Sequence, residues 1–290
     1  MKKILMLAAL TAGLSSVASA QTVNKTGWPS ELKFGVIPVE GSKDATVRYK
    51  ALVDYLSKTL GIPVKFSVGA DYAAVIVAMG SKQVDIAEFG AASYIKAVDQ
   101  GNAEAFVRAN QVKGGLGYNS IMIVKASSAI KTEADAKGKT FSFVDPNSTS
   151  GYLVPLVHIY NDLKSKPEEY FSKVVFAGSH EASILSVANG KTDVGVTNNL
   201  DYNLVLEKGA IKKDELRVLW TSKVIPVGPI AWRKDLPESF KTALKDAFLG
   251  FKDAKGLDEM NIKGYVTSSD ADFNPTRDVE KIKAELTGKK

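Results

Sequence analysis

Three consecutive hydroxyl side chains, Ser148, Thr149 and Ser150, form the stretch of this chain best suited to binding chemistry. They follow an apolar, β-rich run at residues 140–144 and precede a helical run at residues 153–160. The start of a helix carries unpaired N–H groups and the positive end of the helix dipole, so it attracts anions. A single Ser or Thr there is an ordinary helix cap. Three hydroxyls with Gly151 behind them exceed what one cap requires, which indicates a cradle for an oxyanion.

Further polar candidates follow other expected strands, where ligands of α/β sheets bind. Tyr49 and Tyr94 come from the first half of the chain, and His180 and Asp201 from the second. Each has an alternative interpretation: the tyrosines as packing aromatics, His180 as a neighbour of a helix cap, and Asp201 as a favourable charge in a first helical turn. Neutral N–H and O–H donors at helix ends stabilise a tetrahedral oxyanion without a matching buried cation.

The catalytic motifs of common enzyme classes are missing from the sequence. It contains no Gly-x-Ser-x-Gly elbow, no Walker loop and no His-Glu-x-x-His helix. With two histidines and no cysteine, we expect neither a metal site nor a cofactor. One enzymatic alternative stays open, an exported hydrolase with a hydroxyl nucleophile assisted by His180.

Strands and helices alternate along the chain, which predicts an α/β fold with mainly parallel sheets. The order of elements repeats at an offset of about 108 residues, placing Tyr72 on His180 and Asp85 on Asp193. We therefore expect two doubly wound lobes of like construction, with the ligand in the cleft between them. Thr46 is the expected cap of the helix in lobe one that corresponds to the helix after Ser150. Two extended hinge strands would divide the chain into lobe one (residues 21–119 plus 224–290) and lobe two (residues 120–223).

The first twenty residues read as a Sec signal peptide. Lys2 and Lys3 precede an apolar run at residues 4–17, and Ala18-Ser19-Ala20 is a small-x-small cleavage signature. Cleavage after Ala20 would lower the formal net charge from +6 to +4. This mild, dispersed charge does not indicate nucleic-acid binding. Since a bacterial lipid anchor is carried on cysteine, we expect a free periplasmic protein.

Six segments together resemble the PhnD-like substrate-binding proteins of phosphonate, phosphite and phosphate ABC importers. They are residues 49–56 (YKALVDYL), 71–76 (DYAAVI), 84–90 (VDIAEFG) with the serine-tyrosine pair at 93–94, 145–152 (DPNSTSGY), 179–182 (SHEA) and 225–229 (IPVGP). The resemblance covers essentially the whole mature chain. One departure is Gly90-Ala91, where the family usually has Gly-Pro before the serine-tyrosine pair.

The resemblance implies a type II periplasmic binding protein fold and a set of ligand-binding residues. Ser148, Thr149 and Ser150 would hold the phosphorus oxyanion, and Tyr49 and Tyr94 would close the site from lobe one. His180 matches the family's site histidine. Asp201 falls near a carboxylate that recognises the remaining substituent on the phosphorus atom, and Asn198 and Asn199 lie beside it in the sequence. The implied partners are a small phosphorus ligand and an inner-membrane ABC permease, with the protein as a monomer. Phosphate, phosphite, methylphosphonate and aminoethylphosphonate all stay open as ligands, as does the same fold binding another small molecule or acting as a sensor partner.

Overall fold

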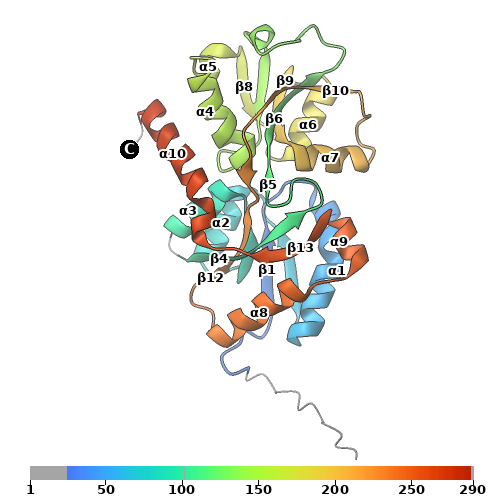
Figure 1. Ribbon diagram of the computed structural model, residues 1–290, viewed down its shortest axis with the longest axis vertical. Helices are drawn as coiled ribbons and strands as arrows, with labels where there is room; N and C mark the ends of the chain where they lie inside the picture. The colour runs from blue at the N-terminus through green and yellow to red at the C-terminus, as the bar shows by residue number, and fades with distance from the viewer. Residues whose placement is uncertain (1–24, 101, 289–290) are drawn as a thin grey trace, which may run out of the picture.

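The computed structural model describes residues 25–100 and 102–288, which form two α/β lobes stacked end to end (Figure 1). The expected signal peptide lies outside the described residues. Lobe one is built on a six-stranded sheet in the order β13-β4-β12-β3-β1-β2. Its strands are β1 (Leu32–Val36), β2 (Val64–Val68), β3 (Ile86–Glu88), β4 (Ala103–Gln111), β12 (Pro229–Arg233) and β13 (Ile262–Thr267).

Lobe two is built on a five-stranded sheet in the order β10-β6-β9-β7-β8. Its strands are β6 (Ser120–Lys125), β7 (Thr140–Phe143), β8 (Lys173–Phe176), β9 (Val194–Asn198) and β10 (Leu216–Thr221). Three neighbouring strands in each lobe are parallel, β2-β1-β3 in lobe one and β8-β7-β9 in lobe two. The other strands pair antiparallel. The expectation of mainly parallel sheets is therefore wrong, because the strands that leave and re-enter each lobe run against the first three.

Helices cover the sheets of both lobes. Lobe one carries α1 (Ser42–Leu60), α2 (Tyr72–Gly80), α3 (Ala91–Asp99), α8 (Glu238–Gly250) and α9 (Ala254–Glu259). Lobe two carries the short turn η1 (Ala134–Ala136), the π-helical turn η2 (Thr149–Leu153), α4 (Val154–Asn161), α5 (Pro167–Tyr170), α6 (His180–Ala188) and α7 (Asn199–Glu207). The chain ends with the 3₁₀ turn η3 (Asp270–Phe273) and α10 (Asn274–Thr287). No helix among these described residues is long and apolar enough to cross a membrane.

The repeat expected from the sequence is present in the elements. At the offset of 108, the bounds of α2 fall on those of α6 and the bounds of α3 on those of α7. The first helix was predicted less well: α1 begins at Ser42 with Gly41 at its N-cap, so Thr46 lies inside the helix and is not its cap. The Thr46 hydroxyl instead donates to the Ser42 carbonyl within the helix.

The two lobes are joined by a pair of short antiparallel strands, β5 (Gly117–Tyr118) and β11 (Ile225–Pro226). Just beyond β11, Gly228 runs against the turn at the end of β3. A Cβ at Gly228 would lie 1.9 Å from the carbonyl oxygen of Phe89, so only glycine fits there. The segment that returns to lobe one after β11 is therefore packed directly against the turn at the end of β3.

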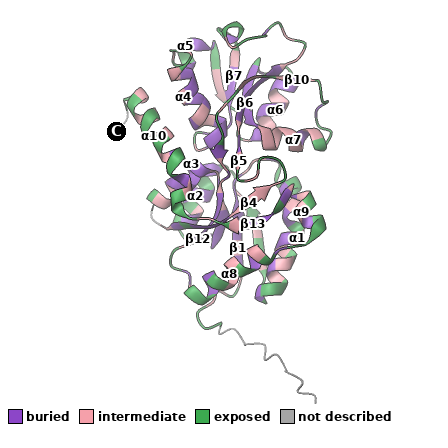
Figure 2. Cartoon of the chain, viewed as in Figure 1, coloured by how far each residue is buried: buried purple, intermediate pink, exposed green. Residues whose placement is uncertain are grey.

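Each lobe has its own hydrophobic core, visible as the purple interior of Figure 2. In lobe one, Phe34 packs edge-on against Tyr49 and Phe248. In lobe two, Phe141 stacks on Phe171 at 4.1 Å between ring centroids. Separate cores let the lobes move as units about the hinge.

The C-terminal helix departs from the predicted division of the chain. Although residues 224–290 were assigned to lobe one, α10 packs against α4 and η2 of lobe two as well as α3 of lobe one. Figure 1 shows α10 rising alongside both lobes. Lys283 lies over the ring of Tyr152 in η2, which fixes part of this contact. The tail is thus a bridge between lobes.

Candidate functional site

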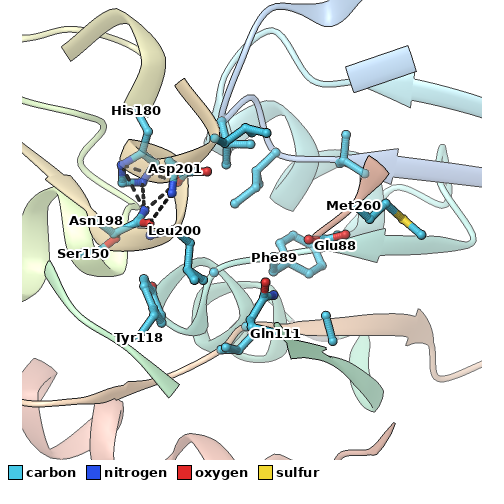
Figure 3. Close-up of a pocket in the computed structure, with 18 of the residues that line it drawn as sticks. Glu88, Phe89, Gln111, Tyr118, Ser150, His180, Asn198, Leu200, Asp201 and Met260 are labelled. Atoms are coloured by element: carbon cyan, nitrogen blue, oxygen red, sulfur yellow. Dashed lines mark hydrogen bonds and ion pairs between the residues drawn. The ribbon is translucent and has the colours of Figure 1, made fainter. Parts of the chain in front are cut away.

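A cavity of about 140 Å³ lies between the two lobes (Figure 3). It is smaller than the roughly 300–1,000 Å³ that drug-sized ligands occupy, so it suits a small molecule. Among its polar lining residues are Arg48, Tyr49, Tyr72, Glu88, Gln111, Tyr118, Ser148, Thr149, Ser150, His180, Asn198, Asp201 and Tyr265. Six of the seven sequence-predicted site residues are therefore brought together, and Tyr94 is not.

The hydroxyl stretch forms the lobe-two wall, at the end of β7. Ser148 caps η2, and its Oγ accepts a hydrogen bond from the Gly151 N–H at 2.9 Å. A Cβ at Gly151 would lie 2.4 Å from the Val144 side chain and 2.8 Å from Ser148 Oγ, so glycine allows the turn to close. The Ser150 carbonyl accepts from Ser120 Oγ at 2.6 Å, which anchors the turn to β6. Three buried hydroxyls are thereby held at a helix start.

His180 begins α6 beside this turn. Its ring lies 3.4 Å from Ser148 Oγ through Nε2 and 3.1 Å from Thr197 Oγ1 through Nδ1. Burial lowers the pKa of His180, and the Asp201 carboxylate acts in the opposite direction. Because the pKa is lowered from 6.5, the imidazole is mostly neutral near pH 7. The 3.8 Å approach of Nδ1 to Asp201 is then not an ion pair.

Asn198 links the histidine to the carboxylate. Its Oδ1 accepts from the Leu200 and Asp201 N–H groups at 2.9 Å and so caps α7. Its Nδ2 donates to Asp201 Oδ2 at 2.6 Å and approaches the His180 ring at 3.3 Å (Figure 3). Asn198 was noted in the sequence only as a neighbour of Asp201, yet an asparagine just before a helix is a recognised cap signal.

Lobe one supplies a charged wall. The Tyr49 hydroxyl donates to Glu88 Oε2 at 2.6 Å, and Arg48 Nε lies 2.6 Å from Glu40 Oε1. Burial raises the pKa of Glu88, Asp201 and Glu40 add to that shift, and Tyr49 and Arg48 oppose it. Glu88 was not among the site residues predicted from the sequence, because a lone carboxylate after a short strand says little by itself.

Three further tyrosines, Tyr72, Tyr118 and Tyr265, line the cavity and were not among the predicted site residues. Burial raises the pKa of Tyr118 to about 12, with Ser150 acting in the opposite direction. Burial also raises the pKa of Tyr72 well above its ordinary value. Both hydroxyls therefore stay protonated and can donate. Tyr72 directly follows Asp71, the N-cap of α2, whose side chain accepts from Ala74 N–H at 2.7 Å.

Tyr94 lies away from the cavity, which corrects the expectation that it closes the site from lobe one. Its hydroxyl donates to Asp270 Oδ1 at 2.9 Å and accepts from the Ala105 N–H at 3.2 Å. Its ring packs on Phe273 at 4.9 Å between centroids. The side chain leaves the start of α3 on the face that supports η3, so it serves lobe-one packing.

Contacts across the cleft show that the lobes are closed on each other. Thr149 Oγ1 accepts from the Ala92 N–H of α3 at 2.9 Å, and Lys96 Nζ donates to Asn147 Oδ1 at 2.6 Å. On the opposite rim, Glu181 Oε2 accepts from the Gly41 N–H at 2.9 Å. Thr149 therefore serves two roles, as part of the hydroxyl turn and as a cross-lobe contact.

Two α/β lobes joined by paired strands, with a polar cavity closed between them, define the class of type II periplasmic binding proteins. No group of three His, Cys, Asp or Glu side chains in the described parts of the chain could hold a metal ion. The cavity therefore presents hydrogen-bonding groups and fixed charges.

The chain belongs to the family of periplasmic substrate-binding proteins of phosphonate ABC transporters, which it matches over residues 34–273. It is 33% identical to the phosphonates-binding periplasmic protein of Escherichia coli, covering 89% of this chain and 78% of that protein. It is 30% identical to the phosphate-import protein PhnD of Mycolicibacterium smegmatis, covering 96% and 94%. The chain is thus a substrate-binding component of an ABC importer.

Solved structures of other binding proteins have the same fold as this chain. The binding protein of an ABC phosphonate transporter from Pseudomonas aeruginosa superposes with a TM-score of 0.85 at 31% identity, covering 89% of this chain and 87% of that one. PhnD1 from Prochlorococcus marinus, in complex with methylphosphonate, superposes with a TM-score of 0.79 at 24% identity, covering 90% and 100%. At that identity, the second likeness supports the fold alone.

Proposed function

We propose that this protein captures a phosphorus oxyanion (phosphonate, phosphite or phosphate) between its lobes and delivers it to an inner-membrane ABC permease. The observation that carries the proposal is the convergence of Ser148, Ser150 and neutral His180 on one closed cavity. Neutral donors at helix starts compensate an oxyanion while adding no net charge. The ligand favours closure because it contacts both walls, and it can shift the equilibrium only by binding the closed form better.

Asp201 gives the site a way to reject sulfate. Near neutral pH sulfate carries no proton, whereas a monoprotonated phosphorus acid can donate one to a carboxylate. Asn198 holds Asp201 Oδ2 in place, which makes the carboxylate a fixed acceptor beside the hydroxyl turn.

The cellular location of the protein and the movement of its lobes belong to the same proposal. Export by the Sec route with cleavage after Ala20 would release a free periplasmic monomer without a lipid anchor. Lobe one (residues 21–119 plus 224–290, apart from α10, which contacts both lobes) and lobe two (residues 120–223) would move about β5 and β11.

Calorimetry with purified, ligand-free protein tests the proposal against phosphate, phosphite, methylphosphonate, 2-aminoethylphosphonate and sulfate. Saturable one-to-one binding of at least one phosphorus ligand, with no binding of sulfate, is expected. Binding of none of them would contradict it. Incubation with p-nitrophenyl phosphate and p-nitrophenyl acetate tests the hydrolase alternative, in which the Ser148–His180 pair would release nitrophenolate.

A further inference from the structure

Two helices of lobe one begin without a capping side chain of their own. α1 and α3 start after glycines, Gly41 and Gly90, which have no side chain that could accept a hydrogen bond from the first turn. The first N–H groups of a helix have no partner within the helix, and leaving them unpaired away from water is unfavourable. Each of these two helix starts instead receives a hydrogen-bond acceptor from lobe two.

Glu181 supplies the acceptor for α1. Its Oε2 accepts a hydrogen bond from the Gly41 N–H at 2.9 Å. The pairing is reciprocal, because the Glu181 N–H, in the first turn of α6, donates to the Val39 carbonyl at 3.2 Å. A carboxylate at a helix start is also stabilised by the positive end of the helix dipole. Residues 39–41 and the start of α6 thus satisfy each other's backbone groups when the lobes are together.

Asp44 is the residue of α1 that could fill this role from within the helix. It is the third residue of α1, and a carboxylate at that position can accept from the N–H of the N-cap residue, as in a capping box. Its Oδ2 instead accepts from Lys208 of lobe two at 2.8 Å. In the closed form the start of α1 is therefore capped from across the cleft and not from its own first turn.

Thr149 supplies the acceptor for α3. Its Oγ1 accepts from the Ala92 N–H at 2.9 Å, and both residues are buried. The corresponding helix of lobe two does not depend on the other lobe in this way. At the offset of 108 residues, Gly90 falls on Asn198, which caps α7 with its own side chain. Of these two matching helix starts, the one in lobe one is completed by the opposite lobe.

We propose that Glu181 and Thr149 are positioning residues that cap α1 and α3 from the opposite lobe, so that closure completes both helix starts and the caps stabilise the closed form. The inference rests on the proposed function, since it assumes that ligand binding closes the lobes. α1 carries Arg48 and Tyr49 of the cavity wall, and Gly90 in the same wall precedes α3. Capping from lobe two therefore fixes the lobe-one wall when the ligand is enclosed. Glu181 itself lies outside the cavity lining.

Amide hydrogen exchange followed by NMR tests the two caps directly. Wild-type protein is compared without ligand and with saturating phosphate, phosphite, methylphosphonate or 2-aminoethylphosphonate, whichever binds. With ligand, the Gly41 and Ala92 amides are expected to exchange about ten-fold more slowly or slower still. The Ala74 amide is the internal control, because Asp71 caps it within lobe one, and its exchange rate should not depend on ligand.

Glu181→Ala should remove the ligand-dependent protection of Gly41 and weaken binding about five-fold, the effect that the loss of a helix cap typically has. The factor should be the same for every phosphorus ligand that binds, because Glu181 acts on closure. Glu181→Gln keeps an oxygen acceptor and should retain most of the affinity. If Glu181 acted only through its charge near Lys208, the glutamine variant would lose as much affinity as the alanine variant. Glu168→Ala, at an exposed position of α5, is the matched control.

Thr149→Val tests the second cap. Valine has nearly the shape of threonine but no oxygen that could accept from the Ala92 N–H. In the variant saturated with ligand, the Ala92 amide should exchange about ten-fold faster than in wild-type protein, while the Gly41 amide keeps its protection. An unchanged exchange rate at Ala92 would show that Thr149 does not cap α3.

A Gly41 amide that exchanges equally fast with and without ligand would overturn the inference. Wild-type affinity in Glu181→Ala, equal losses in the two Glu181 variants, or a loss confined to one ligand would also overturn it. Each of these results leaves the proposed function standing, because wild-type protein still binds a phosphorus ligand. Binding of none of the four ligands by wild-type protein would overturn the proposed function and this inference with it. Thermal unfolding of each variant verifies that a weaker affinity does not reflect a lost fold.

Discussion

Lys208, just past the end of α7 in lobe two, forms an ion pair across the cleft with Glu40 of lobe one. Glu40 is at the same time the partner of Arg48, a residue of the cavity wall. Lys208 also reaches Asp44 in the first turn of α1 at 2.8 Å. One buried carboxylate therefore connects closure of the lobes to the charge of the binding cavity.

Removing this cross-cleft pair should favour the open form. We expect Lys208→Met to weaken ligand binding about two- to ten-fold, since partly exposed ion pairs contribute up to about 1 kcal/mol and Glu40 would lose one of its two cations. Calorimetry in low and high salt measures the effect, and the wild-type affinity should fall more with salt than that of the variant. Lys212→Met, an exposed lysine nearby, is the control. Identical salt dependence of Lys208→Met and wild type would show that the Lys208–Glu40 ion pair does not stabilise the closed form.

The hydroxyl turn should dominate the affinity for the phosphorus end. Ser150→Ala is expected to weaken binding roughly ten- to a hundred-fold, because a hydrogen bond to a charged group is worth about 1.5–3 kcal/mol. Calorimetry with the best phosphorus ligand measures this loss. Ser81→Ala, an exposed serine after α2, should bind as wild type does. Unchanged affinity in Ser150→Ala would remove this hydroxyl from the ligand contacts.

Asp201 should govern discrimination against sulfate. Asp201→Asn is expected to bind the phosphorus ligand roughly ten- to a hundred-fold more weakly and to gain measurable sulfate binding. Competition of sulfate against the phosphorus ligand reports both changes at once. Asp214→Asn, on the surface of lobe two, is the matched control. A variant with wild-type affinity that still rejects sulfate would show that Asp201 does not act in this way.

His158 should make stability depend on pH above about 6.5. It is stacked on Trp220 and lies between Glu133 and Asp162, each 2.6 Å from one ring nitrogen. Burial lowers the pKa of His158, but the hydrogen bonds with the two carboxylates outweigh it and raise the pKa above 6.5. The stabilisation is then complete below the unfolded-state value and is lost as the pH rises through the folded-state value.

The urea midpoint should accordingly fall between pH 6 and pH 8 in wild-type protein, and fall less in Glu133→Gln. Glu169→Gln, an exposed residue of α5, should keep the wild-type slope. His180 acts in the opposite sense and in a lower window, because its lowered pKa makes the protein lose stability as the pH falls below 6.5. An equal pH slope in Glu133→Gln and wild type would contradict the role assigned to His158.

Much of the fold could be predicted from local pattern. The bounds of α6 and the 108-residue repeat follow from the spacing of apolar residues and from caps, which depend on neighbours within one or two turns. The start of α1 was misplaced because its N-cap residue gives no such local signal. Gly41 has no capping side chain, and its N–H donates to a carboxylate of lobe two, Glu181. A cap contributed from the other lobe leaves no local signal.

The sequence by itself determined the two-lobed α/β architecture and the surplus of hydroxyls at Ser148, Thr149 and Ser150. Both depend on the order of residues along the chain, which a local pattern shows directly. Only the tertiary structure decided that Tyr94 turns into the packing of lobe one and that Tyr49 meets Glu88 in the cavity. It alone joined Lys208 to Glu40 across 168 positions of sequence. These contacts are set by how closed lobes bring distant segments together, and the periodicity of a strand or helix carries no information about the surface it will meet.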